Sequence, residues 1–222
     1  MPVRKIPKNW TCITGFIVSA KMGRKRIYWE GEAEWTLFLW LEMDREVLSY
    51  EEQPLYIPFT SAKGRPAQYP PDARASYRSG RTVYWEAKSP AQMSKAIKEK
   101  RLQYRAVFGY LRARGEIFKL FTPNKLSEAF RDNIRFLKPT LLHDFSDLQL
   151  EYVLEGMRRL RETTPETLVD FLAENTEEKL LLFPVLWRLV AEGQIHADLD
   201  QPLVNGCRIW LESPVENERC TR

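Results

Sequence analysis

Cysteine and histidine are scarce in this sequence. Its three cysteines, Cys12, Cys207 and Cys220, are widely scattered and show no C-x-x-C spacing. Neither a disulfide framework nor a zinc site is therefore expected. The only histidines are His143 and His196, which argues against chemistry built on imidazole, whether as a metal ligand or as the base of a nucleophile.

Long apolar runs are also missing. The longest one, Leu180 to Leu186, contains a proline and is far shorter than the roughly 20 residues that a membrane-spanning helix needs. No signal-peptide pattern is present. We therefore expect a soluble, cytoplasmic protein that does not act at a membrane.

Charge is unevenly distributed along the 222 residues. Residues 140–222 contain eight Lys and Arg against sixteen Asp and Glu, a net charge of −8, whereas residues 1–139 contain 26 basic and 14 acidic residues, a net charge of +12. The change of sign predicts two domains, 1–139 and 140–222, with different partners. A strongly basic domain is typical of a surface that neutralises backbone phosphates.

Two carboxylates and a lysine are spaced as in a magnesium-dependent nuclease. A Pro-Asp pair that ends at Asp72 is followed, after thirteen residues, by Glu86-Ala87-Lys88. The segment 81–88 is rich in β-branched and aromatic residues, which predicts a strand. Because side chains alternate along a strand, Glu86 and Lys88 share one face, and Asp72 on a neighbouring strand can lie beside Glu86.

These residue types suit a magnesium ion. Magnesium prefers oxygen ligands and retains several waters, so one or two carboxylates and a substrate phosphate complete its shell. A lysine beside it can orient the attacking water or stabilise the charge that builds on phosphorus. The pattern alone is only moderately specific, because a surface strand with alternating charges contains the same letters.

A third acid, Glu34, stands near the start of a predicted helix. Apolar residues in the segment 34–43 follow the i, i+3, i+4 rhythm of a packed helical face, and a turn then leads into a short strand over residues 47–50. Glu30 and Glu32 compete with Glu34 for a place in the site. All three also suit the N-terminal end of a helix, where the helix dipole favours acids.

In this order, the residues resemble the TnsA family, the endonuclease subunit of heteromeric cut-and-paste transposases. Some members of that family carry glutamine in place of Glu86, so this chain is closer to the general restriction-enzyme pattern. Gln53 and Pro54 are expected to close a strand, since proline commonly marks a strand end. The resemblance covers residues from about 25 to 139 and rests on Glu34, Leu41-Glu42-Met43-Asp44, Val47, Tyr50, Glu52-Gln53-Pro54, Asp72, Glu86-Ala87-Lys88 and a strand at 117–122.

The resemblance implies an α/β fold in two parts. The first is a restriction-endonuclease-like, PD-(D/E)xK catalytic domain at 1–139, and the second is a mostly helical, winged-helix-like domain at 140–222. The implied metal ligands are Glu34, Asp72 and Glu86, which bind Mg²⁺, or Mn²⁺ as its substitute, with two ions in all. The carbonyl of Ala87 adds a ligand, and Lys88 is the catalytic base or the group that positions the attacking water.

The function that follows is that of a bacterial, cytoplasmic, Mg²⁺-dependent DNA endonuclease that hydrolyses the non-transferred 5′ strand at each transposon end. The implied partners are double-stranded DNA at transposon ends, a DDE transposase (TnsB-like) that cuts and joins the 3′ ends, and a regulatory ATPase (TnsC-like). Two alternatives stay open. One is a free-standing restriction or repair nuclease of the same fold, and the other is a non-catalytic adaptor that only docks on DNA.

Two basic clusters are candidates for phosphate contact. One is a turn that contains a glycine and follows an expected strand over residues 10–18, and the other is a predicted helix directly after the strand of Glu86. The charges of that helix are equally consistent with a solvated face. The residues expected to contact DNA are Lys21, Arg24, Lys25 and Arg26 in the turn, and Lys95, Lys98 and Arg101 on the helix.

Residues 140–222 are expected to form helices followed by a hairpin, which is a winged-helix pattern. The third helix of a winged helix normally reads DNA, but a net charge of −8 would repel phosphates. We therefore expect this domain to contact protein. The segments concerned are helices at 147–161, 164–174 and 176–192 and strands at 194–199 and 207–211.

Overall fold

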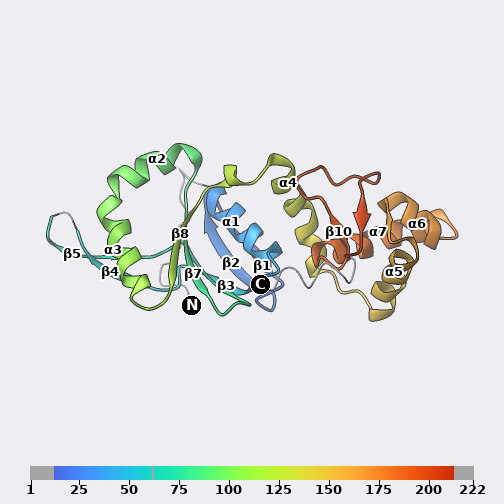
Figure 1. The fold of residues 1–222 in the computed structure, drawn as a ribbon, viewed down its shortest axis with the longest axis horizontal. Helices are drawn as coiled ribbons and strands as arrows, with labels where there is room; N and C mark the ends of the chain where they lie inside the picture. The colour runs from blue at the N-terminus through green and yellow to red at the C-terminus, as the bar shows by residue number, and fades with distance from the viewer. Residues whose placement is uncertain (1–12, 62, 213–222) are drawn as a thin grey trace. The chain divides into compact units, whose positions relative to one another are not determined.

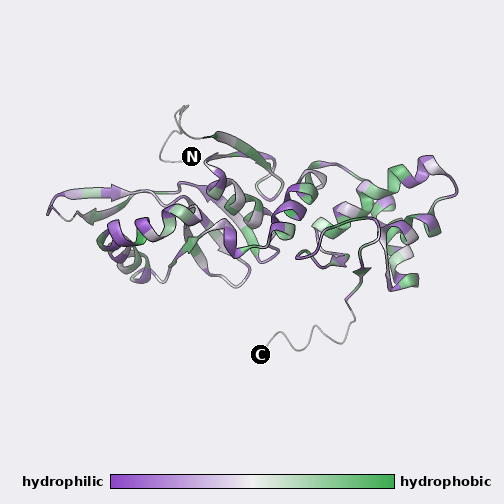
Figure 2. Cartoon of the chain, turned by 90° about the horizontal axis from the view of Figure 1, so that it is seen from above, coloured by the Kyte–Doolittle hydropathy of each residue, from purple (hydrophilic) through white to green (hydrophobic). Residues whose placement is uncertain are grey.

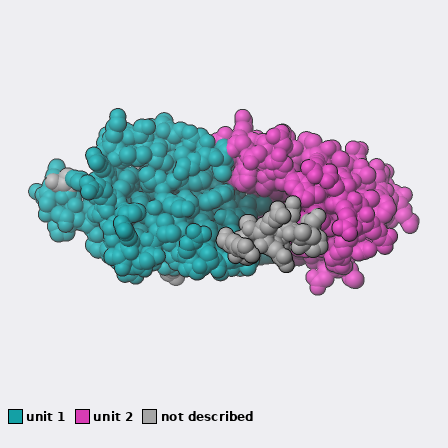
Figure 3. Space-filling model, viewed as in Figure 1, with its two compact units in different colours: residues 1–126 teal, residues 127–222 magenta. Residues whose placement is uncertain are grey.

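The computed structural model describes residues 13–61 and 63–212 and divides the chain into two compact units, Met1–Leu126 and Ser127–Arg222 (Figures 1 and 3). Both units contain helices and strands, so the protein is of the mixed α/β class. The contrast in charge persists across this division. The first unit contains 23 basic and 12 acidic residues, a net charge of +11, and the second contains 11 basic and 18 acidic residues, a net charge of −7.

The division between the units falls before the predicted boundary at residue 139. Helix α4 (Glu128–Leu137) belongs to the second unit. The side-chain amide of its buried Asn133 donates to the carbonyl oxygens of Leu199 and Gln201, at 2.9 and 2.7 Å. Net charge carries no information about such contacts. The division by charge therefore assigned three basic residues, which lie on or next to this helix, to the first domain.

A four-stranded sheet forms the centre of the first unit, in the order β3-β6-β7-β8. Strands β3 (Val47–Glu52), β6 (Ala73–Tyr77) and β7 (Thr82–Ala87) pair antiparallel, and β8 (Ile117–Phe121) runs parallel to β7. The strands predicted around 47–50, 81–88 and 117–122 are thus confirmed. Strand β7 is buried from Val83 to Ala87, as expected for an interior strand of this composition.

Helices cover both faces of this sheet (Figure 1). On one face, α1 (Glu32–Met43) places Trp40 edge-on to Trp85 at 5.2 Å and stacked on Phe121 at 5.7 Å. On the other face, α3 (Arg101–Arg112) packs its Val107 and Leu111 into a core that also contains Ile57, Tyr69 and Tyr84. The first unit is therefore a three-layered structure with its sheet in the middle.

Two hairpins and a short helix complete the first unit. Strands β1 (Thr14–Ser19) and β2 (Lys25–Glu30) form one antiparallel pair, and β4 (Ile57–Thr60) and β5 (Pro66–Tyr69) form the other. The strand expected at 10–18 begins at Thr14, and its residues 10–12 lie outside the described residues. The 3-10 helix η1 (Pro123–Lys125) follows β8.

The basic segment after β7 is two helices rather than the single helix expected. Helix α2 (Pro90–Glu99) begins with Ser89, whose hydroxyl accepts a hydrogen bond from Gln92 N, and with proline in the first turn. It ends at Lys100, where φ is −101° and ψ is 15°, and α3 begins immediately afterwards. The bend directs α3 onto the sheet.

The second unit contains the helices that the sequence predicts, with shorter strands. Figure 2 shows hydrophilic and hydrophobic residues interleaved along these helices. The two predicted strands shrink to two residues each, β10 (His196–Ala197) and β11 (Ile209–Trp210), and a third, β9 (Glu162–Thr163), was not foreseen. The sheet order is β10-β11-β9. Among the described residues, no helix is long and apolar enough to cross a membrane. The elements after α4 are η2 (Lys138–Leu142), α5 (Asp147–Leu160), β9 (Glu162–Thr163), α6 (Pro165–Leu172), α7 (Thr176–Ala191), β10 (His196–Ala197) and β11 (Ile209–Trp210).

Candidate functional site

Asp72 lies where β6 and β7 meet. The antiparallel register pairs Ala73 with Trp85, so the residue before β6 reaches the C-terminal end of β7. The backbone N–H of Asp72 donates to the carbonyl of Trp85 at 3.0 Å, and its carboxylate accepts a hydrogen bond from Ala87 N at 2.7 Å. The prediction that a carboxylate at position 72 lies beside the end of this strand is confirmed.

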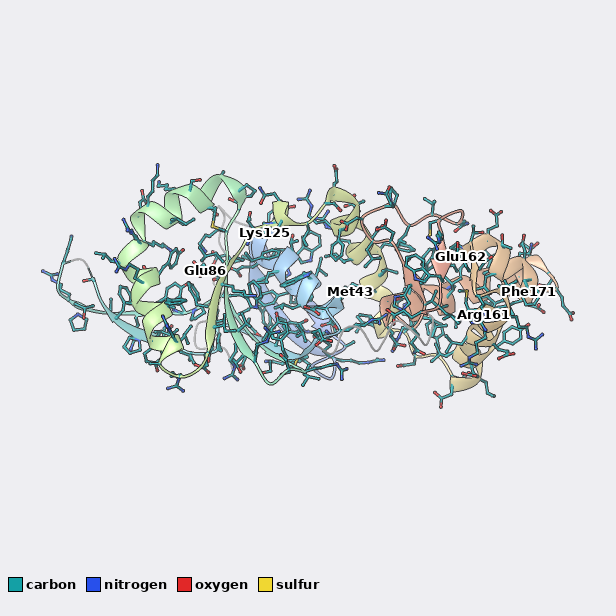
Figure 4. The ribbon with its side chains drawn as sticks, viewed as in Figure 1. Met43, Glu86, Lys125, Arg161, Glu162 and Phe171 are labelled. Carbon is teal, nitrogen blue, oxygen red and sulfur yellow. The ribbon has the colours of Figure 1, made fainter. Side chains whose placement is uncertain are left out.

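Lys88 joins the two strands through its ammonium group. Its Nζ lies 2.6 Å from Glu86 Oε1 and 3.6 Å from Asp72 Oδ2, and it donates to the carbonyl oxygen of Ala87 at 2.8 Å. Glu86, labelled in Figure 4, is 2% exposed and Asp72 is 8% exposed. The expected proximity of Glu86 and Lys88 is therefore present, in a largely buried setting.

Glu34 enters the same cleft from the first turn of α1. The chain leaves β2 at Glu30 and turns through Gly31, whose φ of 87° is a left-handed conformation that glycine adopts without strain. The Glu34 carboxylate then accepts a hydrogen bond from Glu30 N at 2.8 Å. The cleft has a volume of about 760 Å³ and its lining includes Glu30, Glu32, Glu34, Asp72, Glu86, Ala87 and Lys88.

Two tyrosines that the sequence did not single out bind Glu86. The hydroxyl of Tyr69, on β5, donates to Glu86 Oε2, and the hydroxyl of Tyr104, on α3, donates to Oε1 at 3.3 Å. Together with Lys88, they give this carboxylate three side-chain donors. In the sequence, Tyr69 and Tyr104 stand among the apolar positions of a strand and a helix. That pattern predicts packing and gives no indication of a contact with Glu86.

The segment that closes β3 holds the backbone of Asp72. Gln53 follows the last residue of β3, and its N–H donates to the carbonyl oxygen of Asp72 at 3.0 Å. Gln53 is buried and has a φ of 41°, an uncommon conformation for a residue other than glycine. The expectation that Gln53 and Pro54 close a strand is confirmed, and the structure adds a direct link to the site.

Burial and shared negative charge set the protonation of the cleft. Burial raises the pKa of Glu34 to about 7, against the opposing effects of the Glu30 N–H and Lys88. Burial also raises the pKa of Asp72 well above its usual value, and the charges of Glu86 and Glu34 raise it further. For Lys88, burial lowers the pKa, but Asp72 and Glu86 more than reverse this, so its pKa lies above the ordinary value. The cleft is short of positive charge.

The donor set of the cleft fits a hard divalent cation. Carboxylate and carbonyl oxygens from Glu34, Asp72, Glu86 and Ala87 are the ligand types that Mg²⁺ and Mn²⁺ prefer, and a cation would relieve the excess of negative charge. Within residues 13–61 and 63–212, no group of three His, Cys, Asp or Glu side chains is already arranged to hold a metal ion. Magnesium commonly retains several waters and binds substrate phosphate oxygens, and these would complete the shell of an ion held here.

Lys21 has a structural position instead of the DNA contact expected of it. Its ammonium donates to the carbonyl oxygens of Leu41, Asp44 and Val47, at 3.0 Å for Leu41 and 2.9 Å for Val47. Burial lowers its pKa to about 8. Because an ammonium has three N–H donors, these carbonyls account for all of them, and Lys21 fastens the end of α1 to the start of β3.

The other expected DNA contacts divide among four places. Arg24, Lys25 and Arg26 are exposed at the β1–β2 turn, and Arg26 also lies over the ring of Phe16 at 4.8 Å. In the second basic cluster, which follows β7, Lys95 lines the cleft that contains Glu86. Lys98 is exposed in the last turn of α2, and Arg101 lines a separate groove against α3 and β8.

Comparison with known proteins finds no family model that matches this chain and no curated protein that matches it.

Proposed function

We propose that this chain is a metal-dependent DNA endonuclease, the subunit of a cut-and-paste transposase that cleaves the non-transferred 5′ strand at transposon ends beside a DDE transposase. One observation carries the proposal: Glu34, Asp72, Glu86 and Lys88, which come from a helix and two paired strands, line one cleft. The alternative explanation of Glu86 and Lys88 is a solvent-exposed strand with alternating charges. It is disfavoured, because Glu86 is buried and bound by three donors.

Two arrangements support the finer fold assignments within this proposal. In the first unit, the paired carboxylates at the ends of β6 and β7, with helices on both faces of the sheet, are the arrangement expected of a restriction-endonuclease-like domain. In the second unit, the element order α5, β9, α6, α7, β10, β11 and the sheet order β10-β11-β9 are those expected of a winged helix.

Each side chain of the cleft has a distinct part in the proposed reaction. Glu34, Asp72 and Glu86 would hold the cation, and the Ala87 carbonyl would add a neutral ligand. When bound, Mg²⁺ supplies positive charge that polarises the phosphate and lowers the pKa of the attacking water. Lys88 orients that water and stabilises the charge that develops on the phosphate oxygens. Tyr69 and Tyr104 fix the direction of the Glu86 carboxylate.

The charge of each unit supports a division of labour. A first unit with a net charge of +11 attracts DNA without regard to sequence, and its Lys95 lies at the cleft itself. A second unit with a net charge of −7 repels phosphates. We assign the second unit to contact with protein, either the DDE transposase or a regulatory ATPase, and assign recognition of the transposon ends to a partner.

The test is cleavage of transposon-end DNA by the full chain in Mg²⁺ or Mn²⁺, with and without a cognate DDE transposase. Asp72→Ala is compared with wild type and with Glu46→Ala, an exposed acid outside the cleft. We expect cutting of the 5′ ends that requires both the partner and Asp72, with Glu46→Ala as active as wild type. Cutting by the chain alone would favour a free-standing nuclease, and no cutting under any condition would favour an adaptor.

A further inference from the structure

Strand β8 lies at the end of the four-stranded sheet formed by the described residues. The carbonyl oxygen of Phe121 accepts a hydrogen bond from Lys88 N, on the β7 side. Because the backbone groups of alternate residues point to opposite sides of a strand, Phe118 and Leu120 direct theirs away from β7. The outward carbonyl oxygen of Leu120 accepts a hydrogen bond from the side chain of Lys125 at 3.2 Å. The ammonium of Lys125 is exposed, so an incoming strand can displace it.

A groove on each face of the sheet borders this edge. The first, about 600 Å³, lies against α2 and α3 and is lined by Ile97, Arg101, Arg105, Phe108, Phe118 and Leu120, among others. Ile97 is 46% exposed and Phe108 is 49% exposed, so apolar surface is open to solvent there. Since Phe118 and Leu120 alternate with Lys119 and Phe121, the strand presents side chains to both grooves.

The second groove, about 400 Å³, lies on the α1 face and is lined by Trp40, Trp85, Lys119, Phe121 and Lys125, among others. All charged side chains that line either groove are positive: Arg101, Arg105, Lys119 and Lys125. Apolar surface, an open strand edge and basic charge are thus combined in one place.

We propose that the β8 edge binds an extended segment of a partner protein, which adds to the sheet as a fifth strand. Backbone hydrogen bonds to Phe118 and Leu120 would hold the segment, with apolar side chains in the grooves and acidic side chains on Arg101 and Arg105. The apolar lining disfavours DNA, whose backbone would leave that surface uncovered. A second copy of the chain would bring the same positive charges against these. Arg101 is thereby assigned a peptide ligand in place of the DNA that the sequence suggested.

The probe is a fluorescent peptide of about eight residues, the length of an ordinary strand, in which valine alternates with glutamate. Its binding to the full chain is measured by fluorescence anisotropy. We expect saturable binding that weakens about fivefold in Arg101→Ala/Arg105→Ala, since each exposed charge pair contributes modestly. Arg112→Ala is the matched control, an exposed arginine at the end of α3 that does not line the groove. It should bind as wild type does.

Two further measurements address the mode of binding. A peptide that is N-methylated at every residue cannot donate backbone hydrogen bonds from either of its edges and should not bind, and the glutamate peptide should protect the amides of Phe118 and Leu120 from hydrogen exchange. Equal binding of the N-methylated peptide, or of one with lysine in place of glutamate, would overturn the proposal. So would the absence of saturable binding, or binding of duplex DNA that is lost in Arg101→Ala/Arg105→Ala while peptide binding is not. None of these outcomes depends on nuclease activity.

Discussion

The backbone N–H of Gln53 donates to the carbonyl oxygen of Asp72 at 3.0 Å. This bond joins the end of β3 to the start of β6. The backbone of Asp72, an acid of the cleft, is thus held by a residue nineteen positions earlier in the sequence. Gln53 makes this bond in an uncommon backbone conformation, with a φ of 41°. The Glu-Gln-Pro segment thus contributes to the site through the backbone.

Substitution of Gln53 separates its backbone role from its side chain. Gln53→Gly keeps the N–H and accepts a positive φ, so we expect the fold to persist. Gln53→Pro removes the donor and fixes φ near −65°, and we expect it to lower the free energy of unfolding by about 3 kcal/mol. Urea unfolding of the two variants makes the comparison. Similar stability for both would mean that the bond to Asp72 contributes little.

Stability should depend on pH through Glu34. Its pKa is about 7 in the folded protein and near 4.5 when unfolded, so between these values the folded state holds a proton that the unfolded state has lost. The free energy of unfolding therefore falls as pH rises from about 4.5 to 7, and Asp72, whose pKa is also raised, adds to the fall. Glu34→Gln should remove up to about 3 kcal/mol of this dependence. Glu46→Gln should leave it unchanged, and an unaltered profile in Glu34→Gln would contradict the assignment.

Divalent cations should stabilise the protein by relieving the negative charge of the cleft. At a concentration of Mn²⁺ about 100 times its dissociation constant, the gain is about 2.7 kcal/mol. We expect the rise in melting temperature to shrink strongly in Asp72→Asn and Glu86→Gln and to persist in Glu46→Gln. Thermal unfolding with and without Mn²⁺ reads this without any DNA. An equal rise in all four proteins would place the ion elsewhere.

Removal of the tyrosine hydroxyls should act on Glu86. Tyr69 is 4% exposed, so Tyr69→Phe leaves a buried carboxylate oxygen without its donor, at a cost of about 1–3 kcal/mol. Tyr104→Phe breaks the longer bond of a half-buried group and should cost less. Urea unfolding measures both, with Tyr110→Phe on the same helix as the reference. A loss in Tyr110→Phe as large as that in Tyr69→Phe would show that the effect is not specific to Glu86.

Lys21 and Arg24 should separate stability from DNA affinity. Lys21→Met retains the apolar stem but abandons three backbone carbonyls, so we expect a loss of about 2 kcal/mol or more in the free energy of unfolding. Arg24→Ala, at the exposed turn, should leave stability within about 0.5 kcal/mol and weaken salt-dependent binding to duplex DNA. The reverse pattern, in which Lys21→Met folds normally and loses only DNA affinity, would restore Lys21 to the DNA surface.

Local pattern was sufficient for most elements of this fold. The β-branched and aromatic residues around Glu86 predicted β7, and the threonine and proline at 164 and 165 predicted the start of α6, because strands and helix caps are encoded by neighbouring residues. The gathering of Glu34, Asp72, Glu86 and Lys88 was predicted as well, since two paired strands dictate most of it. Family resemblance supplied the place of Glu34.

What the sequence did not predict depends on contacts between distant segments. Tyr69 and Tyr104 reach Glu86 only because a hairpin and a bent helix pack on the same side of the sheet. Lys21 lies in a basic run, and only the packing of α1 reveals that carbonyls surround it. The division between the compact units falls before residue 139 for the same reason, because Asn133 is bound to residues more than 60 positions later.

Main-chain groups fix the position of Asp72 on both sides: the N–H groups of Gln53 and Ala87 and the carbonyl of Trp85. Such a site tolerates exchange of the surrounding side chains but depends on chain length. A single residue inserted within β7, between Val83 and Glu86, would place the two parts of the strand out of phase, so that Glu86 and Val83 could not both keep their present faces of the sheet. Insertions within the strand should therefore be far more damaging than insertions in the exposed turn at 78–81 or most substitutions along either strand, an asymmetry that a scan of insertions and point substitutions across residues 73–87 would reveal.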